Sequence, residues 1–246
     1  MNQHNEKREL EIQSERSKKL RAMGELAAAM AHEIRNPLGS IELFASMIKS
    51  GMLEGEEIKK FSEHILVSVK KLDCLITNLL IFSNLPKPAL FKIDPNNFIE
   101  EFFGSLKYFL EQNNIELKKN ISSEPASILV DREFFKQTLL NIVINSLQAM
   151  PEAGIISVNT YLSAANYDFL KTYYVIEISD TGCGISPDVI DKIFNPFFST
   201  KEKKAGIGLS IVNNIMETHK GLIEVESKEN KGALFRLKFP LVIMET

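Results

Sequence analysis

The chain has 246 residues, of which 44% are hydrophobic and 25% charged, and its formal net charge is -3. This composition is typical of a globular protein and gives no electrostatic reason to expect a nucleic-acid partner. The two cysteines, Cys74 and Cys183, lie in no metal-ligand spacing, which favours a reduced, cytoplasmic compartment. We expect no signal peptide, because residues 1–19 are polar, and no membrane segment, because no apolar run approaches roughly 20 residues.

After a polar N-terminal segment or truncated linker (1–19), two helical patterns occupy residues 20–85. In the first pattern, apolar residues recur at alternating steps of four and three, as in a coiled-coil-like bundle. These residues are Met23, Ala27, Met30, Ile34, Pro37, Ile41, Phe44 and Ile48. A break at 51–55 separates them from a second pattern over 58–82. Two such helices cannot bury both stripes alone, so we predict an antiparallel helical hairpin that forms a dimeric four-helix bundle, and hence a homodimer.

A linker at 86–88 contains two prolines and precedes a region of mixed signals, 90–246. We expect helices over 97–110, 131–150 and 209–219, and strands over 128–130, 155–162, 173–179, 222–225 and 233–239. Asp131 is a candidate N-cap for the second of these helices. The short turn at 230–232 would make the last two strands antiparallel, so we predict a two-layer α/β sandwich with a mixed sheet.

His32 is the first candidate catalytic residue. In heptad numbering it lies at position f, the most exposed, with Glu33 beside it and Asn36 one turn further on the same face. Neutral imidazole can act as a nucleophile near pH 7, and Glu33 could accept its proton. The alternative is a solvated surface pair, which is the more common role of an exposed histidine.

The predicted helix over 131–150 carries the second candidate site. Asn141 and Asn145 share one face of an otherwise apolar helix, which is awkward unless they face a polar ligand. An asparagine carbonyl is a hard oxygen that suits Mg²⁺, so Asn145 is a candidate metal ligand. The alternative is a pair of helix amides that are satisfied within the protein.

Two glycine-rich segments follow. Asp180 ends a predicted strand and could accept a hydrogen bond from adenine, while Gly182 and Gly184 allow either close approach of a flat ring or a sharp turn. Gly206, Gly208 and Leu209 lead directly into a helix, and free N–H groups at a helix N-terminus bind phosphate.

Between the two glycine segments we expect a lid, roughly 182–205, with a short helix capped by Ser186 and with Lys201 as a phosphate contact. The alternative for its three phenylalanines and its lysines is a small hydrophobic patch beside a solvated basic loop.

The order of these motifs resembles that of two-component sensor histidine kinases over about residues 20–240. The segments that resemble the H, N, G1, F and G2 boxes are 32–38, 141–149, 180–184, 194–198 and 206–210. The resemblance implies a HisKA-type dimerisation and phosphoacceptor domain followed by a Bergerat-type ATP-binding domain of the HATPase_c class. Residues 23–40 are similar to the cytoplasmic NtrB-like and flagellar-regulatory kinases. Lys204 departs from the family, which often has glycine there.

The resemblance implies that ATP and Mg²⁺ are the cofactors, that His32 is autophosphorylated, and that the phosphoryl group passes to an aspartate in a response regulator receiver domain. The implied ATP-binding residues are Asn141, Asn145, Asp180, Gly182, Gly184, Lys201, Gly206, Gly208 and Leu209. Asn36 is expected to position water for dephosphorylation of the regulator.

Three rival functions remain at this stage. A gyrase- or chaperone-like ATPase would need a glutamate where the chain has Asn141. A serine or other protein kinase would need the Gly-rich strand loop and the Val-Ala-Ile-Lys and His-Arg-Asp strings, which the sequence lacks. A non-enzymatic scaffold would bind nucleotide without transferring phosphate.

Overall fold

The structure is a computed structural model that describes residues 30–51, 54–83, 87–165, 168–200 and 206–242. Predictions that concern Met23, Ala27, Lys201 or Lys204 lie outside these residues. The chain divides into two compact units, and each is described by itself. Unit 1 comprises 1–77 and 197–207, and unit 2 comprises 78–196 and 208–246.

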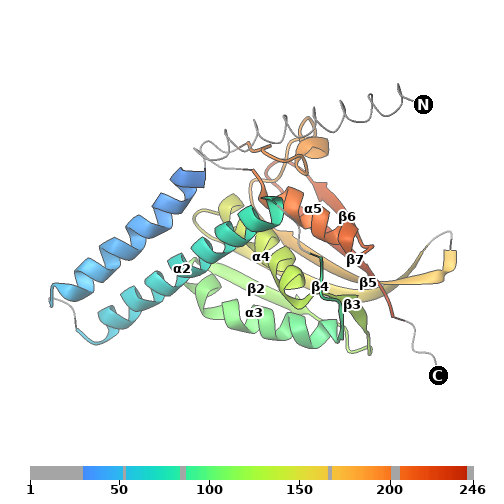
Figure 1. Ribbon diagram of the computed structural model, residues 1–246, viewed down its shortest axis with the longest axis horizontal. Helices are drawn as coiled ribbons and strands as arrows, with labels where there is room; N and C mark the ends of the chain where they lie inside the picture. The colour runs from blue at the N-terminus through green and yellow to red at the C-terminus, as the bar shows by residue number, and fades with distance from the viewer. Residues whose placement is uncertain (1–29, 52–53, 84–86, 166–167, 201–205, 243–246) are drawn as a thin grey trace, which may run out of the picture. The chain divides into compact units, whose positions relative to one another are not determined.

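Unit 1 contains a helical hairpin, as the two apolar stripes predict. A helix over residues 30–49 runs through Pro37, which is buried, and α2 (Glu56–Ser83) follows after the turn (Figure 1). Gly51 and Gly55 have φ of 69° and 41°, in the left-handed region that glycine adopts without strain. The ring of Phe44 stacks on Phe61 with centroids 5.4 Å apart, which joins the two helices.

The hairpin of a single chain leaves part of its apolar surface exposed. Val69 and Ile76, which belong to the predicted stripe of the second helix, are 48% and 46% exposed. Other large apolar residues exposed on the two helices are Leu38, Leu43, Met47, Ile58, Leu66 and Leu80. One hairpin therefore does not bury its own apolar surface, as expected if a second copy is needed.

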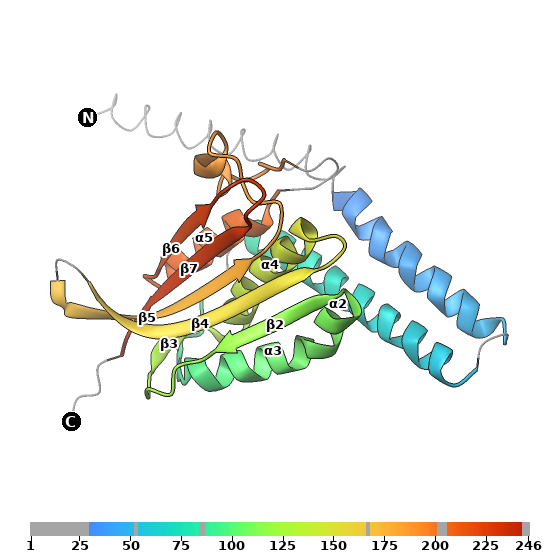
Figure 2. The same ribbon diagram turned by 180° about the vertical axis from the view of Figure 1, so that it is seen from behind.

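Unit 2 is built on a mixed sheet with strand order β2-β4-β5-β7-β6 (Figure 2). The strands are β2 (Ile115–Asn120), β4 (Gly154–Ala165), β5 (Asp168–Asp180), β6 (Leu222–Ser227) and β7 (Ala233–Pro240). Strand β2 pairs with β4 in parallel, while the β4–β5, β5–β7 and β6–β7 pairs are antiparallel, which confirms the predicted mixed sheet. A smaller sheet pairs β1 (Phe91–Ile93) with β3 (Ile128–Val130).

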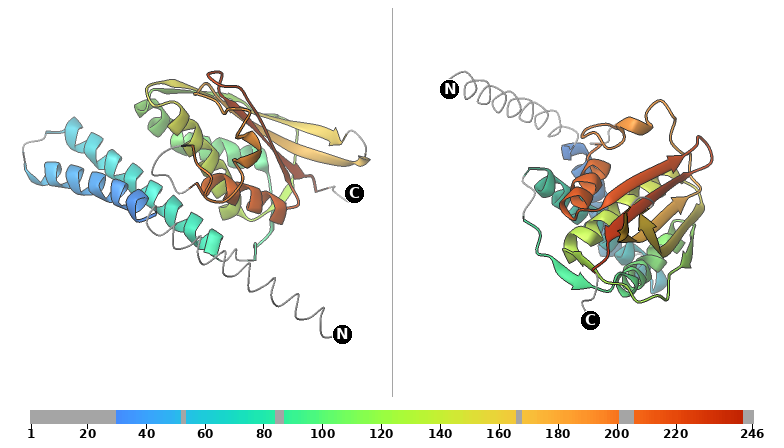
Figure 3. Two further views of the ribbon diagram at one scale, coloured as in Figure 1. Left: turned by 90° about the horizontal axis from the view of Figure 1, so that it is seen from above. Right: turned by 90° about the vertical axis from the view of Figure 1, so that its right-hand side faces the viewer.

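Three helices lie on one face of the main sheet, so unit 2 has the predicted two layers (Figures 1 and 3). They are α3 (Pro95–Gln112), α4 (Arg132–Ala149) and α5 (Gly208–Thr218). The core lies between the layers, where Phe135 of α4 contacts Phe98 of α3 at 4.8 Å and Phe239 of β7 at 5.2 Å between ring centroids. Among the described residues, no helix is both long and apolar enough to span a membrane.

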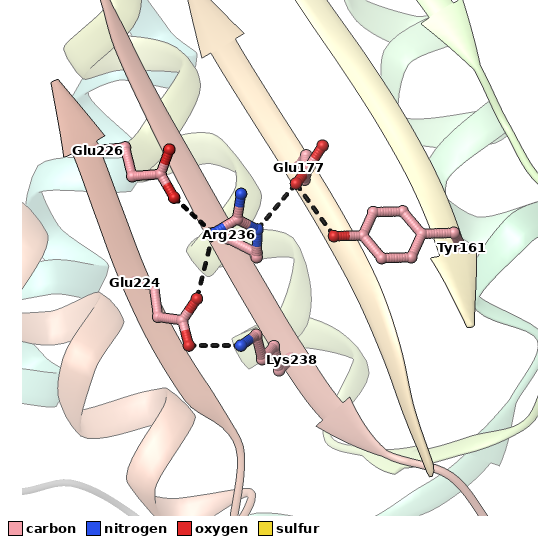
Figure 4. Close-up of polar contacts among 6 residues, drawn as sticks. All are labelled: Tyr161, Glu177, Glu224, Glu226, Arg236 and Lys238. Atoms are coloured by element: carbon pink, nitrogen blue, oxygen red, sulfur yellow. Dashed lines mark hydrogen bonds and ion pairs between the residues drawn. The ribbon is translucent and has the colours of Figure 1, made fainter. Parts of the chain in front are cut away.

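The opposite face of the sheet carries a polar network. Its members are Tyr161, Glu177, Glu224, Glu226, Arg236 and Lys238 (Figure 4). The Arg236 guanidinium donates to Glu177 at 2.8 Å and to Glu226 at 2.9 Å, and these bonds raise its pKa. The bond from Lys238 lowers the pKa of Glu224. The alternation between an apolar and a charged face along β7 is what a sheet covered on one side requires.

Of the two helix N-caps predicted from the sequence, one is confirmed and one is wrong. The Asp131 carboxylate accepts from the backbone N–H groups of Glu133 and Phe134, so the predicted N-cap is confirmed. The short helix predicted after Ser186 is wrong, because the segment forms only a 3-10 turn at Ile190–Lys192. Three-residue turns of this kind need few local hydrogen bonds, and their extent depends on the surrounding packing.

Candidate active site

The candidate phosphoacceptor His32 lies on the first helix of unit 1. Its Nδ1 is 3.4 Å from Asn36 Nδ2, so the predicted shared face is confirmed. His32 is half-buried and Asn36 is exposed, so the prediction that His32 occupies the most exposed position is wrong. A heptad position gives the side of the helix on which a residue lies and not the packing of its side chain.

The Asp180 carboxylate lies at the end of β5 and is only 7% exposed. Its Oδ1 accepts from the backbone N–H of Gly182 at 3.0 Å and of Ala233 at 3.3 Å. Its Oδ2 accepts from the Ser146 hydroxyl of α4 at 3.0 Å. Sequence reasoning missed Ser146, although it directly follows Asn145. These three donors hold the carboxylate in one orientation and keep it a hydrogen-bond acceptor.

Gly182 and Gly184 are required by packing. A Cβ on Gly182 would lie 2.5 Å from the side chain of Ala149 at the end of α4. Gly184 has φ of 69°, and a Cβ there would lie 2.1 Å from the Lys228 carbonyl oxygen. The sequence left open whether these glycines allow close approach of a ring or a sharp turn. In the structure they lie in a turn that packs against neighbouring backbone.

The second glycine segment is divided between the units. Gly206 belongs to unit 1, has φ of 64° and accepts a hydrogen bond from the Phe197 N–H at 3.1 Å. Gly208 and Leu209 begin α5 in unit 2. A Cβ on Gly208 would meet nothing closer than Asn141 Oδ1 at 3.7 Å, so the start of α5 lies beside the Asn141 helix.

The two asparagines of α4 differ in their surroundings. Asn145 Nδ2 is buried and has no hydrogen-bond partner among the described residues. Asn141 is 4% exposed and bonds to Asn78 at the end of α2, a contact that sequence reasoning missed. A buried N–H donor without a partner is unfavourable, so Asn145 Nδ2 best fits a hydrogen-bond acceptor on a polar ligand.

A buried histidine ties α4 to α5. His219 Nε2 accepts from the Asp131 N–H at 3.0 Å, and its Nδ1 lies 2.7 Å from the Ile215 carbonyl oxygen. Burial lowers the pKa of His219, although the Ile215 bond and the Asp131 charge act in the opposite direction. The neutral imidazole therefore connects the N-cap of α4 with the C-terminus of α5.

Unit 2 thus brings Asn141, Asn145, Asp180 and Gly208 around α4. A fixed carboxylate acceptor, the side-chain carbonyl oxygen of Asn145 and the N-terminus of α5 are the kinds of group that bind adenine, a hard cation and phosphate. The residues present therefore fit Mg²⁺-ATP.

Comparison with known proteins agrees with this arrangement. Residues 22–87 match the family described as His Kinase A (phospho-acceptor) domain. Residues 130–243 match the family described as histidine kinase-, DNA gyrase B- and HSP90-like ATPase. Sensor histidine kinase ZraS of Escherichia coli (strain K12) is 34% identical over 95% of this chain and 49% of its own length. Sporulation kinase C of Bacillus subtilis (strain 168) is 32% identical over 92% of this chain and 50% of its own length.

Solved structures agree as well. Histidine kinase ThkA in complex with response regulator protein TrrA has a TM-score of 0.59 and 27% identity, over 95% of this chain and 66% of that one. The chain belongs to the two-component histidine kinases, with a phosphoacceptor region followed by an ATPase region. It spans about half the length of the curated relatives it matches.

Proposed function

We propose that this chain autophosphorylates His32 from Mg²⁺-ATP and passes the phosphoryl group to an aspartate of a response regulator. The observation that carries the proposal is the buried Asp180 carboxylate of unit 2, oriented by Ser146, in a chain that also carries His32 beside Asn36 on a helical hairpin. A nucleotide site and a nucleophile are the two parts that a histidine kinase needs.

Bound Mg²⁺-ATP would supply the transferable γ-phosphoryl group and the cation that neutralises its charge. Asp180 would accept a hydrogen bond from the adenine amino group, and the Asn145 carbonyl oxygen would bind the cation. The N–H groups of Gly208 and Leu209 at the start of α5 would bind phosphate oxygens. Gly182, Gly184 and Gly206 shape the surrounding backbone, and we keep Lys201 as a proposed phosphate contact.

In the proposed transfer, a ring nitrogen of His32 forms a bond to the γ-phosphorus while the bond from phosphorus to the ADP oxygen breaks. The attacking nitrogen is the one that carries no proton in neutral imidazole, and Glu33 is the proposed acceptor of the proton on the other ring nitrogen as the bond to phosphorus forms. Asn36 would position water when the regulator is dephosphorylated.

The exposed apolar residues of the hairpin support a homodimer through a four-helix bundle. We propose that 20–85 is the dimerisation and phosphotransfer domain and that 90–246 is the catalytic domain. ATP as phosphate donor and the two free cysteines support a cytoplasmic site of action. A response regulator partner is supported by ThkA, which has been solved with its regulator TrrA.

The test is incubation with γ-labelled ATP and Mg²⁺, comparing wild type with His32→Gln. The matched control is His64→Gln, which changes the half-buried histidine of the other hairpin helix. We expect acid-labile, base-stable label on wild type and on the control, and none on His32→Gln. Label that persists in His32→Gln would refute the phosphoacceptor assignment, and wild type that binds ATP without labelling would favour the scaffold function.

A further inference from the structure

Three buried side-chain amides meet where the last turns of α2 lie against α4. Asn78 of α2 is 4% exposed, and Gln137 and Asn141, one turn apart on α4, are 7% and 4% exposed. Asn78 Nδ2 donates to Asn141 Oδ1 at 2.9 Å, and Asn141 Nδ2 donates to Asn78 Oδ1 at 3.1 Å. Gln137 Nε2 donates to the same Asn78 oxygen at 2.7 Å. All three residues belong to unit 2.

The reciprocal pair determines which way the Asn141 amide points. Asn78 offers a donor to the Asn141 oxygen and an acceptor to the Asn141 nitrogen. If the Asn141 amide flipped, oxygen would face oxygen and N–H would face N–H, and a buried polar group without a partner is strongly disfavoured. The Gln137 bond holds the Asn78 oxygen in place, so the orientation of Asn78 is itself determined.

Asn141 lies where such orientation matters for a ligand. Its Oδ1 is the nearest atom to a Cβ built on Gly208, the first residue of α5. One turn further along α4 is Asn145, whose buried Nδ2 has no partner among the described residues. The amide that Asn78 orients is therefore next to the start of α5 and one helical turn from Asn145.

We propose that Asn78 is a positioning residue for the nucleotide site, acting through Asn141. This inference rests on the proposed function, because it takes the Asn141, Asn145 and Gly208 region to be the ATP site. Helix α2 begins in unit 1, where Phe61 packs on Phe44, and its residues from Asn78 onward belong to unit 2.

The experiment measures ATP affinity by calorimetry with Mg²⁺, and KM and kcat for His32 labelling, in the full chain. Asn78→Ala removes all three contacts, and the matched control Asn97→Ala makes the same change at an exposed position of α3. We expect Asn78→Ala to weaken ATP binding and raise KM about tenfold, because two buried amides each lose hydrogen bonds to Asn78. Asn97→Ala should match wild type.

Asn78→Asp is the second variant, and it decides the question if Asn78→Ala does not fold. Its carboxylate still accepts from Asn141 and Gln137 but cannot donate to Asn141 Oδ1, so its ATP affinity should fall below those of wild type and Asn97→Ala. An Asn78 variant with a lowered unfolding midpoint but the ATP affinity and KM of Asn97→Ala would overturn the proposal, since the contact would then be structural only. Wild type that binds ATP without labelling His32 would refute the kinase function, while the affinities would still decide the role of Asn78.

Discussion

The Asp131 side chain connects two parts of unit 2, and replacing it with alanine should destabilise that unit. One carboxylate oxygen caps α4 by accepting from the N–H groups of Glu133 at 3.0 Å and Phe134 at 3.2 Å. The other oxygen accepts from the N–H of Ala89, which follows the linker, at 2.8 Å. The side chain is half-buried, so water compensates for part of any loss.

The expected magnitude follows from these two sets of bonds. Loss of an N-cap side chain costs about 1 kcal/mol. Loss of the bond from Ala89 costs about 1 kcal/mol for a half-buried acceptor. Asp131→Ala should therefore lower the free energy of unfolding by about 2 kcal/mol. Asp131→Asn keeps an oxygen for the cap but turns an N–H towards Ala89, so its cost should be about 1 kcal/mol.

Tyrosine fluorescence during urea unfolding measures this change in unit 2 alone. The chain has no tryptophan, and all five tyrosines lie between residues 108 and 174. With a typical slope of about 2 kcal/mol/M, the midpoint of Asp131→Ala should fall by about 1 M urea. If Asp131→Asn were as destabilising as Asp131→Ala, the cap would contribute nothing and the reasoning would be refuted. An unchanged midpoint in Asp131→Ala would refute it as well.

Two further predictions concern buried side chains. Ser146→Ala should weaken ATP binding roughly fivefold, because Asp180 loses a donor that orients its carboxylate, and calorimetry that found unchanged affinity would contradict this. Burial holds the pKa of His219 in the folded protein below its ordinary 6.5. As the pH drops through 6.5, His219 therefore takes up a proton in the unfolded chain before it does so in the folded protein. The free energy of unfolding falls over this range, until the pH has passed the lower pKa of the folded protein. The urea midpoint of the wild type, measured between pH 7.5 and about 5, should show this loss of stability, and that of His219→Gln should fall less over the same range. If the midpoints of the two proteins changed equally with pH, His219 would be excluded as the cause.

The elements of the fold that could be predicted from sequence are those determined by residues close to one another in the chain. The alternating four- and three-residue steps predicted the hairpin, and Asp131 marked the start of α4 because its carboxylate reaches N–H groups only two and three residues ahead. The last strand was predicted over 233–239, and β7 spans Ala233–Pro240. Strand β2 was missed, because its sequence is mostly polar and its ladder is supplied by β4, which lies some forty residues further on.

The candidate site divides in the same way. His32, Asn141, Asn145 and Asp180 were identified from sequence, because each stands in a short motif whose residue types suit the expected chemistry. The half-buried state of His32 was not predicted, since a heptad position gives only the side of the helix on which a residue lies. The packing that excludes a side chain at Gly182 and Gly184 was not predicted either, because the residues in the way, Ala149 and Lys228, lie in other segments of the chain.

By itself, the sequence determined the family, the order of its two regions and the residue types that could carry the chemistry. Only the tertiary structure decided which polar groups orient these residues: Ser146 for Asp180, and Asn78 for Asn141 across 63 positions of the chain. The physical reason is that a side-chain hydrogen bond requires two atoms within about 3 Å in a defined direction. Periodicity and local propensity place a residue on a helix face, but the packing of the helices against each other and on the sheet sets that distance.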